Sequence, residues 1–142
     1  VGVLSDRKME KFGNKVEKLP FMDWKQLPSV MAGIDINLMP LENSLFHWCK
    51  SENKWTEAAL VKVPSVMSRN CEMEYVVENG KDGWMCTTKE EWVNALEALV
   101  TDEKARKAMG EAAHQKVMEH YLTVNTGKDA MEELLCSESY TK

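Results

Sequence analysis

Apolar residues along the chain occur in short runs, separated by segments in which they recur every three or four positions. Short apolar runs are typical of strands buried in a parallel sheet, whereas the wider spacing is typical of helices. The runs predict five strands, of which the second is the weakest, at residues 1–4, 15–19, 34–39, 64–68 and 84–86. Strands that alternate with helices at this spacing predict an α/β fold, with a parallel sheet flanked by helices on both faces.

The segments between and after these runs carry the helical pattern. Asp23 or Trp24 is expected to start a helix that ends at Gly33, and Thr88 with Glu91 forms the capping-box pattern of another helix. The remaining chain is expected to contain a short helix or turn within residues 5–14, a loop at 69–74, a helical turn at 75–78, and helices starting at 102 and spanning 127–136.

The helix predicted between the third and fourth apolar runs is the one around which the chain is organised. Ser51 is expected to cap its amino end, because a serine hydroxyl accepts hydrogen bonds from first-turn amides. The helix should end at residue 61 or 62, since Pro64 cannot donate within a helix. Counting at helical spacing gives a mostly apolar face with Trp55, Ala58, Ala59 and Lys62, and a polar one with Lys50, Lys54, Glu57 and Val61.

The start of this helix is a candidate anion site. Its exposed amides carry partial positive charge, and Lys50 and Lys54 would strengthen the attraction to a phosphate. Glu57 lies about two turns further along, about 10 Å from Lys50 at a rise of about 1.5 Å per residue. A nucleoside diphosphate with its phosphates at the helix start could present its ribose hydroxyls to this carboxylate. The alternative is an ordinary solvated stripe of charges.

Length and composition narrow the classes of function. We predict one partial domain over residues 1–142, with an α/β part at about 1–88 and a helical part at about 89–136. The net charge of -5 offers no basic surface for nucleic acid, and no apolar run reaches membrane-spanning length. The four cysteines and three histidines lack metal-ligand spacing, so reduced thiols and no metal site are expected.

Several segments together resemble a known family. They are Asp35–Glu42, Lys50–Trp55, Glu57–Val66 and Val76–Cys86, followed by the helix from Glu91 to Leu99. In this order and at these separations they are similar to the donor-binding half of retaining GT-B glycosyltransferases, the glycosyl transferases group 1 family. The resemblance covers nearly the whole chain. It implies a Rossmann-like domain that binds a nucleoside-diphosphate sugar at the carboxyl ends of its strands.

The resemblance also implies the residues of the site. Glu57 matches the family's ribose-binding glutamate, and Lys50 and Ser51 match the loop that approaches the phosphates and the sugar. The loop at Pro20–Met22 resembles the segment that packs against the nucleobase. The full donor-binding set is Glu57, Lys50, Ser51, Lys54, Glu52, Glu42, Pro40, Phe21 and Met22. For Glu42 a solvated loop acid is an equal alternative, no catalytic residue is identified, and no cofactor is expected.

The sequence departs from the common family pattern in three ways. Cys49 stands where a second glutamate is widespread, and Lys50-Ser51-Glu52 replaces the usual Gly-Phe-Gly. The opening strand and helix of the donor domain, and the whole acceptor-binding domain, are expected to be missing before Val1. Because transfer needs the acceptor held against the anomeric carbon, the chain alone is expected to be inactive and to bind its donor weakly. The uncovered domain interface would allow self-association.

The overall expectation is the donor-binding part of a retaining hexosyltransferase. The implied acceptor is a glycan or a lipid-linked sugar in bacterial surface polysaccharide synthesis. The implied location is the cytoplasm, at the membrane periphery in the full-length protein. The alternative is a non-catalytic nucleotide-binding or interaction module of the same fold. A receiver-like domain is disfavoured, because Asp35 precedes its strand instead of following it.

Overall fold

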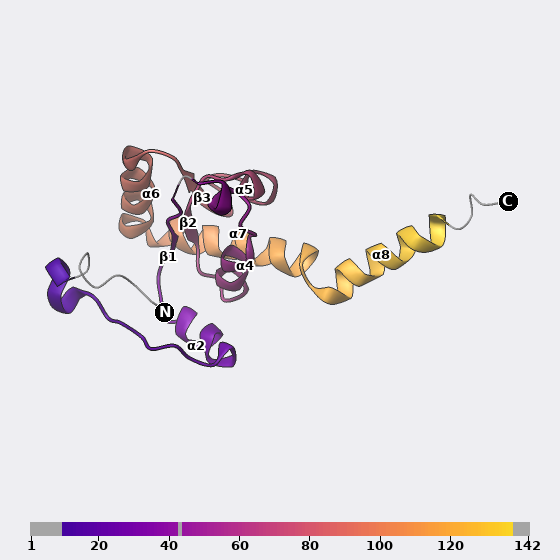
Figure 1. Cartoon of the computed structure of the whole chain (residues 1–142), viewed down its shortest axis with the longest axis horizontal. Helices are drawn as coiled ribbons and strands as arrows, with labels where there is room; N and C mark the ends of the chain where they lie inside the picture. Colours follow the sequence, from indigo (N-terminus) through magenta and orange to yellow (C-terminus); the bar gives the residue numbers. More distant parts are fainter. Residues whose placement is uncertain (1–9, 43, 138–142) are drawn as a thin grey trace.

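The computed structural model describes residues 10–42 and 44–137 (Figure 1). The strand predicted at residues 1–4 lies outside this range. The elements, with η marking 3-10 helices, are η1 (Glu10–Lys15), η2 (Trp24–Gln26), α2 (Leu27–Met31), β1 (Asn37–Met39), α3 (Leu45–Trp48), α4 (Asn53–Leu60), β2 (Ser65–Ser68), α5 (Cys71–Val76), β3 (Trp84–Cys86), α6 (Lys89–Thr101), α7 (Glu103–His120) and α8 (Thr123–Ser137).

The three described strands form a parallel sheet in the order β1-β2-β3. Successive side chains of a strand point to opposite faces, and β2 shows this clearly. Val66 packs with the residues of α6 on one face, and Met67 packs with those of α4 and α7 on the other. In Figure 1 α6 and α4 accordingly lie on either side of the strands. The predicted fold class, a parallel sheet flanked by helices, is confirmed.

The face covered by α4 carries the larger hydrophobic cluster. Trp55 and Ala59 of α4 are fully buried in this cluster, and Ala58 is fully buried in a separate one, as the apolar face predicted from the sequence requires. The indole Nε1 of Trp55 donates to the Asp82 carbonyl oxygen at 2.9 Å, so this large buried ring keeps its polar group paired. The rest of the cluster comes from the strands, α5, α7 and the segment after α5: Met39, Met67, Met73, Val77, Met85, Ala113 and Val117.

The opposite face is covered by α6, whose start follows the predicted pattern. The Thr88 hydroxyl accepts from the amide of Glu91 at 3.2 Å, and the Glu91 carboxylate accepts from the amide of Thr88 at 3.1 Å. This capping box satisfies two amides that the first turn leaves without helical partners. Asp102 caps α7 in the same way, accepting from the amide of Ala105 at 3.0 Å. Both predicted helix starts are confirmed.

Two backbone positions allow α7 to pack closely against the end of α4. Lys62 closes α4 in the left-handed conformation, with φ of 62°. Gly110 of α7 lies directly over it, where a Cβ atom would be 2.1 Å from the Lys62 carbonyl oxygen and 3.3 Å from Cδ of Pro64. No side chain fits at residue 110 unless one of the two backbones moves.

A buried carboxylate links the predicted turn before β3 to α7. Asp82 is 3% exposed. One of its oxygens accepts from the amide of Glu78 at 2.8 Å, and the other lies 2.7 Å from Nζ of Lys116. Since a buried charge needs both a counter-ion and hydrogen bonds, these two partners are what allow an aspartate in this core.

The strand predicted at residues 15–19 is wrong, because Lys15 ends η1 and residues 16–19 have no regular structure. Val16 and Leu19 are half-buried, and the charged residues beside them are exposed. Two apolar side chains in five residues supply too little apolar surface for a strand covered on both faces. The strand predicted at 34–39 is also too long, since β1 begins at Asn37.

The predicted N-cap of α4 is wrong by one residue. The helix begins at Asn53 and its N-cap is Glu52, not Ser51. The loop before it also contains the unpredicted helix α3. The Ser44 hydroxyl caps α3 by accepting from the amide of His47 at 3.4 Å.

Helix α5 replaces the predicted loop at 69–74 and the turn at 75–78. Asn70 starts it, because its side-chain oxygen accepts from the amide of Met73 at 2.8 Å. The last helix, α8, begins four residues before the predicted position and extends away from the sheet in Figure 1. Among the described residues, no helix has both the length and the apolar character needed to cross a bilayer.

Candidate functional site

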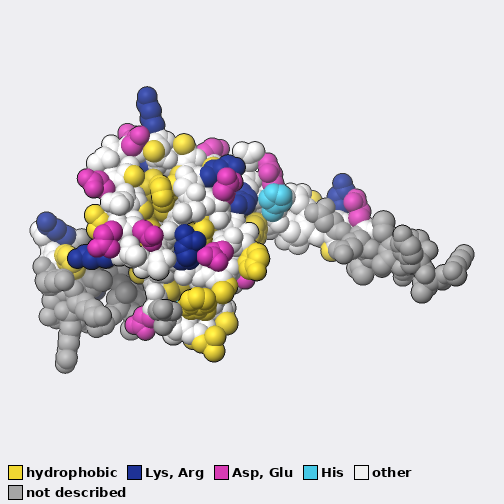
Figure 2. Space-filling view, turned by 90° about the horizontal axis from the view of Figure 1, so that it is seen from above, with side chains coloured by type: hydrophobic (Ala, Val, Ile, Leu, Met, Phe, Trp, Pro, Cys, Tyr) yellow, Lys and Arg dark blue, Asp and Glu magenta, His cyan; other side chains and the backbone are white. Residues whose placement is uncertain are grey.

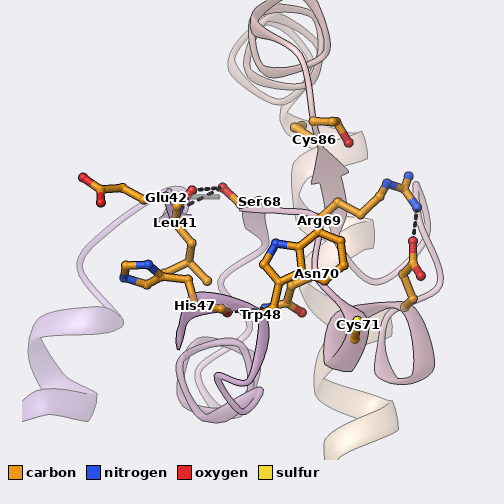
Figure 3. Close-up of a pocket in the computed structure, with 11 residues that line it drawn as sticks. Leu41, Glu42, His47, Trp48, Ser68, Arg69, Asn70, Cys71 and Cys86 are labelled. Atoms are coloured by element: carbon orange, nitrogen blue, oxygen red, sulfur yellow. Dashed lines mark hydrogen bonds and ion pairs between the residues drawn. The ribbon is translucent and has the colours of Figure 1, made fainter. Parts of the chain in front are cut away.

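Two cavities open at the edge of the sheet where the strands end. The β1–β2 cavity has a volume of about 430 Å³, and its lining includes Pro40, Lys50, Ser51, Asn53, Lys54 and Ser68. The β2–β3 cavity has a volume of about 260 Å³, and its lining includes Glu42, His47, Trp48, Arg69, Asn70 and Cys86 (Figure 3). The carboxyl ends of parallel strands are where ligands bind in sheets of this kind, so both cavities are candidate sites.

Two lysines at the start of α4 give the β1–β2 cavity its charge. Nζ of Lys50 lies 5.2 Å from the centroid of the Phe46 ring, a cation–π distance. The backbone of Lys54 is held in place because its carbonyl oxygen accepts from the side-chain amide of Asn37 at 3.3 Å. No aspartate or glutamate lines this cavity in the described part of the chain, so its lining carries a formal charge of +2.

The amino end of α4 adds main-chain donors on the same side. Glu52 occupies the N-cap position but its side chain makes no capping hydrogen bond. The first amides of a helix have no partners within the helix, and in α4 the Glu52 side chain does not substitute for them. Asn53 and Lys54, the first two helical residues, line the cavity. An anion bound there would meet amides as well as lysines.

The wall between the two cavities includes Leu41, Ser68 and Asn70, which line both of them. Ser68, at the end of β2, accepts from the amide of Leu41 at 2.8 Å and donates to the carbonyl oxygen of the same residue at 3.2 Å. Both residues line both cavities. The loop after β1 is therefore fixed to the end of β2, with Pro40 on one side of the wall and Glu42 on the other.

The structure brings together only part of the site predicted from the sequence. Lys50, Ser51, Lys54 and Pro40 share the β1–β2 cavity, and Glu42 lines the neighbouring one. The other predicted residues line neither cavity: Glu57 is exposed on α4, Glu52 is half-buried at its N-cap, Phe21 is 92% exposed and Met22 is half-buried before η2.

The β2–β3 cavity contains residues that the sequence did not single out. Nδ1 of His47 lies 2.7 Å from the Ser44 hydroxyl, and Arg69 forms an ion pair with Glu74 at 3.1 Å. Asn70, which is 4% exposed, joins α3 to α5 by donating to the His47 carbonyl oxygen at 3.5 Å. The cap patterns at Ser44 and Asn70 are the sequence signals that could have placed α3 and α5, and with them this cavity.

Cys71 and Cys86 both line this cavity, and Cys86 is a poor nucleophile at neutral pH. Burial raises the pKa of the Cys86 thiol, and the negative charge of Glu91 contributes in the same direction. A thiol that stays protonated reacts slowly. Among the residues that the structure describes, no three His, Cys, Asp or Glu side chains are grouped so that they could hold a metal ion.

A parallel sheet between helices, with cavities at the strand ends, defines a Rossmann-like domain. The family described as glycosyl transferases group 1 matches residues 2–102, and the chain belongs to this family. A solved structure with the same fold is the C-terminal domain of a glycosyl transferase group 1 family protein, LpcC, from Francisella tularensis. The TM-score is 0.62 with 17% sequence identity, and the match covers 82% of this chain and 60% of that one.

No curated protein matches the sequence. The resemblance inferred from the sequence motifs is nevertheless confirmed, because the family match and the shared fold agree. The chain thus has the sequence pattern and the fold of this family, and it spans about 60% of the length of the solved chain that it matches.

Proposed function

We propose that this domain binds the nucleoside-diphosphate sugar donor of the glycosyltransferase, with the diphosphate in the β1–β2 cavity. The observation that carries the proposal is that Lys50 and Lys54 line one cavity together with the uncapped start of α4. Positive side chains and free helix amides are the groups that bind phosphate. The cavity volume of about 430 Å³ lies within the range of small-molecule sites.

The ribose is assigned to Glu57, which is exposed and follows Lys54 by three residues on α4. Residues three apart lie on the same side of a helix, about 4.5 Å apart along its axis. A nucleotide whose phosphates contact Lys54 could therefore place its ribose hydroxyls against the Glu57 carboxylate. The exposed Phe21 and its neighbour Met22 remain the proposed nucleobase contacts.

The finer description of the enzyme rests on the family resemblance. In this proposal a hexosyl group passes with retention to a glycan or lipid-linked acceptor in surface polysaccharide synthesis, without a metal, on the cytoplasmic side of the membrane. Transfer then needs an acceptor-binding domain as well, because acceptor and donor must be held together. Trp24, Leu45 and Phe46 are at least 71% exposed and support a contact with that domain or with a second copy.

The test of donor binding is a thermal-shift and NMR screen of UDP, GDP, dTDP and ADP. At least one diphosphate should bind, and Lys50→Ala or Lys54→Ala should each weaken it about five- to tenfold, through loss of a charge-assisted contact. Lys128→Ala removes a lysine from α8 and serves as the matched control. Binding that both site variants leave undiminished would move the site elsewhere, and no binding by any of the four diphosphates would refute the proposal.

The ribose assignment has its own test. Wild type should prefer UDP to 2′,3′-dideoxy-UDP, and the Glu57→Ala variant should lose that preference, because it has no carboxylate to accept from the two hydroxyls. An unchanged preference would remove Glu57 from the site without affecting the lysines. Diphosphate binding without glycosyl transfer by the full-length protein would support the alternative function, a non-catalytic nucleotide-binding module.

A further inference from the structure

We propose that Asn37 is a positioning residue for the diphosphate site. Its side-chain amide holds the amino end of α4 against the sheet, so that Lys54 and the first helix amides open into the β1–β2 cavity. The inference rests on the proposed function of that cavity and concerns a residue that does not line it. It follows from the place of Asn37 in the sheet, from its two hydrogen bonds and from the other contacts of α4.

Asn37 and Ser65 form a polar pair on the face of the sheet that α4 covers. They are register partners on β1 and β2. Because side chains alternate along a strand, Asn37 lies on the same face as Met39, which belongs to the larger hydrophobic cluster. Asn37 is half-buried, and Ser65 is only 1% exposed. A buried polar group costs free energy unless it is hydrogen-bonded, so this pair depends on its hydrogen bonds.

The side-chain amide of Asn37 has two N–H donors, and two different elements supply acceptors for them. Nδ2 donates to the Ser65 hydroxyl at 3.0 Å and to the Lys54 carbonyl oxygen at 3.3 Å. One amide group thus joins β1, β2 and α4. Residue 54 is inside α4, where its carbonyl also accepts from the amide four residues further on. Since the helix satisfies this carbonyl by itself, the contact with Asn37 serves to fix where the helix begins.

Other polar contacts hold α4 at different points. Nε1 of Trp55 donates to the Asp82 carbonyl oxygen at 2.9 Å, towards the turn before β3. Nδ1 of His114 lies 3.0 Å from the carbonyl oxygen of Ala59, near the carboxyl end of the helix. The contact with Asn37 is at the opposite end, beside the cavity. It is therefore the contact whose loss should displace the lining of the phosphate site.

The position of the helix start matters because the surface has no broad basic area to attract a phosphate. Acidic and basic side chains are intermixed on the face shown in Figure 2, and the net charge is -5. The attraction of the cavity therefore comes from Lys50, Lys54 and the first amides of α4, and the effect of helix amides falls off within the first turn. Lys50 is held separately, since its amide donates to the His47 carbonyl oxygen at 3.3 Å.

The experiment compares wild type with the double variant Asn37→Leu/Ser65→Ala. Replacing both partners of a hydrogen bond with apolar groups is nearly neutral for stability, whereas removing one partner is not. The double variant should therefore melt within about 4 °C of wild type. It should bind whichever of UDP, GDP, dTDP and ADP binds best about three- to tenfold more weakly, because the start of α4 must then be ordered on binding. Unchanged affinity would overturn the proposal.

A positioning role also predicts which lysine is affected. Lys54→Ala should weaken diphosphate binding about five- to tenfold in wild type but less than about twofold in the double variant, because Lys54 is already displaced there. Lys50→Ala should weaken binding equally in both backgrounds. If Lys54→Ala has the same effect in both backgrounds, Asn37 does not act through Lys54 and the proposal is wrong.

His114→Leu is the matched control. It removes a side-chain contact to a carbonyl oxygen of α4, as the loss of Asn37 does, but at the other end of the helix. Diphosphate affinity should stay within about twofold of wild type. If this control weakens binding as much as the double variant does, any loosening of α4 is sufficient and Asn37 has no special role.

Hydrogen exchange tests the role of Asn37 without a ligand. The amides of Trp55 and Thr56 both donate to the Glu52 carbonyl oxygen, at 2.8 and 3.0 Å, and close the first turn of α4. They should exchange at least about fivefold faster in the double variant, because the helix start opens more often. Faster exchange without diphosphate binding by wild type would refute only the proposed function. Diphosphate binding with neither affinity nor exchange changed in the double variant would refute only the role of Asn37.

Discussion

The contact between α7 and the end of α4 gives a sharp prediction for Gly110→Ala. A Cβ atom there would lie 2.1 Å from the Lys62 carbonyl oxygen, about 0.9 Å inside the 3.0 Å that real Cβ contacts respect. Because the obstacle is backbone, we take the upper end of the overpacking range, about 3 kcal/mol. The better helix propensity of alanine offsets about 1 kcal/mol of this. The net loss of unfolding free energy should be about 2 kcal/mol.

The assay is guanidinium denaturation followed by circular dichroism, with a thermal melt of the same samples. A loss of about 2 kcal/mol should lower the melting temperature by roughly 8 °C for a domain of this size. Gly127→Ala is the matched control, since nothing lies within 4 Å of a Cβ atom at this position of α8. The control should be neutral or stabilising by up to about 1 kcal/mol. A Gly110→Ala variant as stable as wild type would refute the packing argument.

Two further predictions concern buried charge and pH. Asp82→Ala should lower the free energy of unfolding, measured by urea denaturation, by about 3 kcal/mol, because Lys116 and the Glu78 amide lose their partner. Asp82→Asn should lower it less, since the amide oxygen can still accept a hydrogen bond. Equal losses in the two variants would contradict this reasoning. The amides of Thr87 and Thr88 lower the pKa of Glu91 below its usual 4.5. The ionised carboxylate therefore contributes fully to the stability of the folded state above pH 4.5, and this contribution is lost as the pH falls through the lowered pKa. The stability gap between wild type and Glu91→Gln should therefore close in acid, and a constant gap would count against the capping box.

The parts of the fold that could be predicted from the sequence are those set by local chemistry. The capping box at Thr88 and the aspartate cap at Asp102 involve neighbouring residues only, and both helix starts were correct. The segment at 15–19 failed because a strand needs partners far along the chain, and a weak apolar run does not specify them. Glu52 replaced Ser51 as the N-cap since the tertiary position of α4 outweighed a preference of about 1 kcal/mol.

The same distinction between local and long-range contacts applies to the candidate site. Lys50, Ser51 and Lys54 were predicted because one helix start brings them together, and they do share a cavity. The β2–β3 cavity combines α3, the end of β2 and the end of β3, which are far apart in sequence. Trp48 and Arg69 become neighbours of one cavity only after the sheet has formed, so spacing along the chain could not identify them.

The two hydrogen bonds between Ser68 and Leu41 couple the shape of the β1–β2 cavity to that of the β2–β3 cavity. Because Ser68 is part of β2, the loop residue bonded to it can move toward one cavity only if the end of β2 moves as well. Replacing that hydroxyl would release the loop after β1 from the end of β2 and would alter the lining of both cavities. A substitution at Ser68 would therefore be felt at both cavities, although they face different pairs of strands.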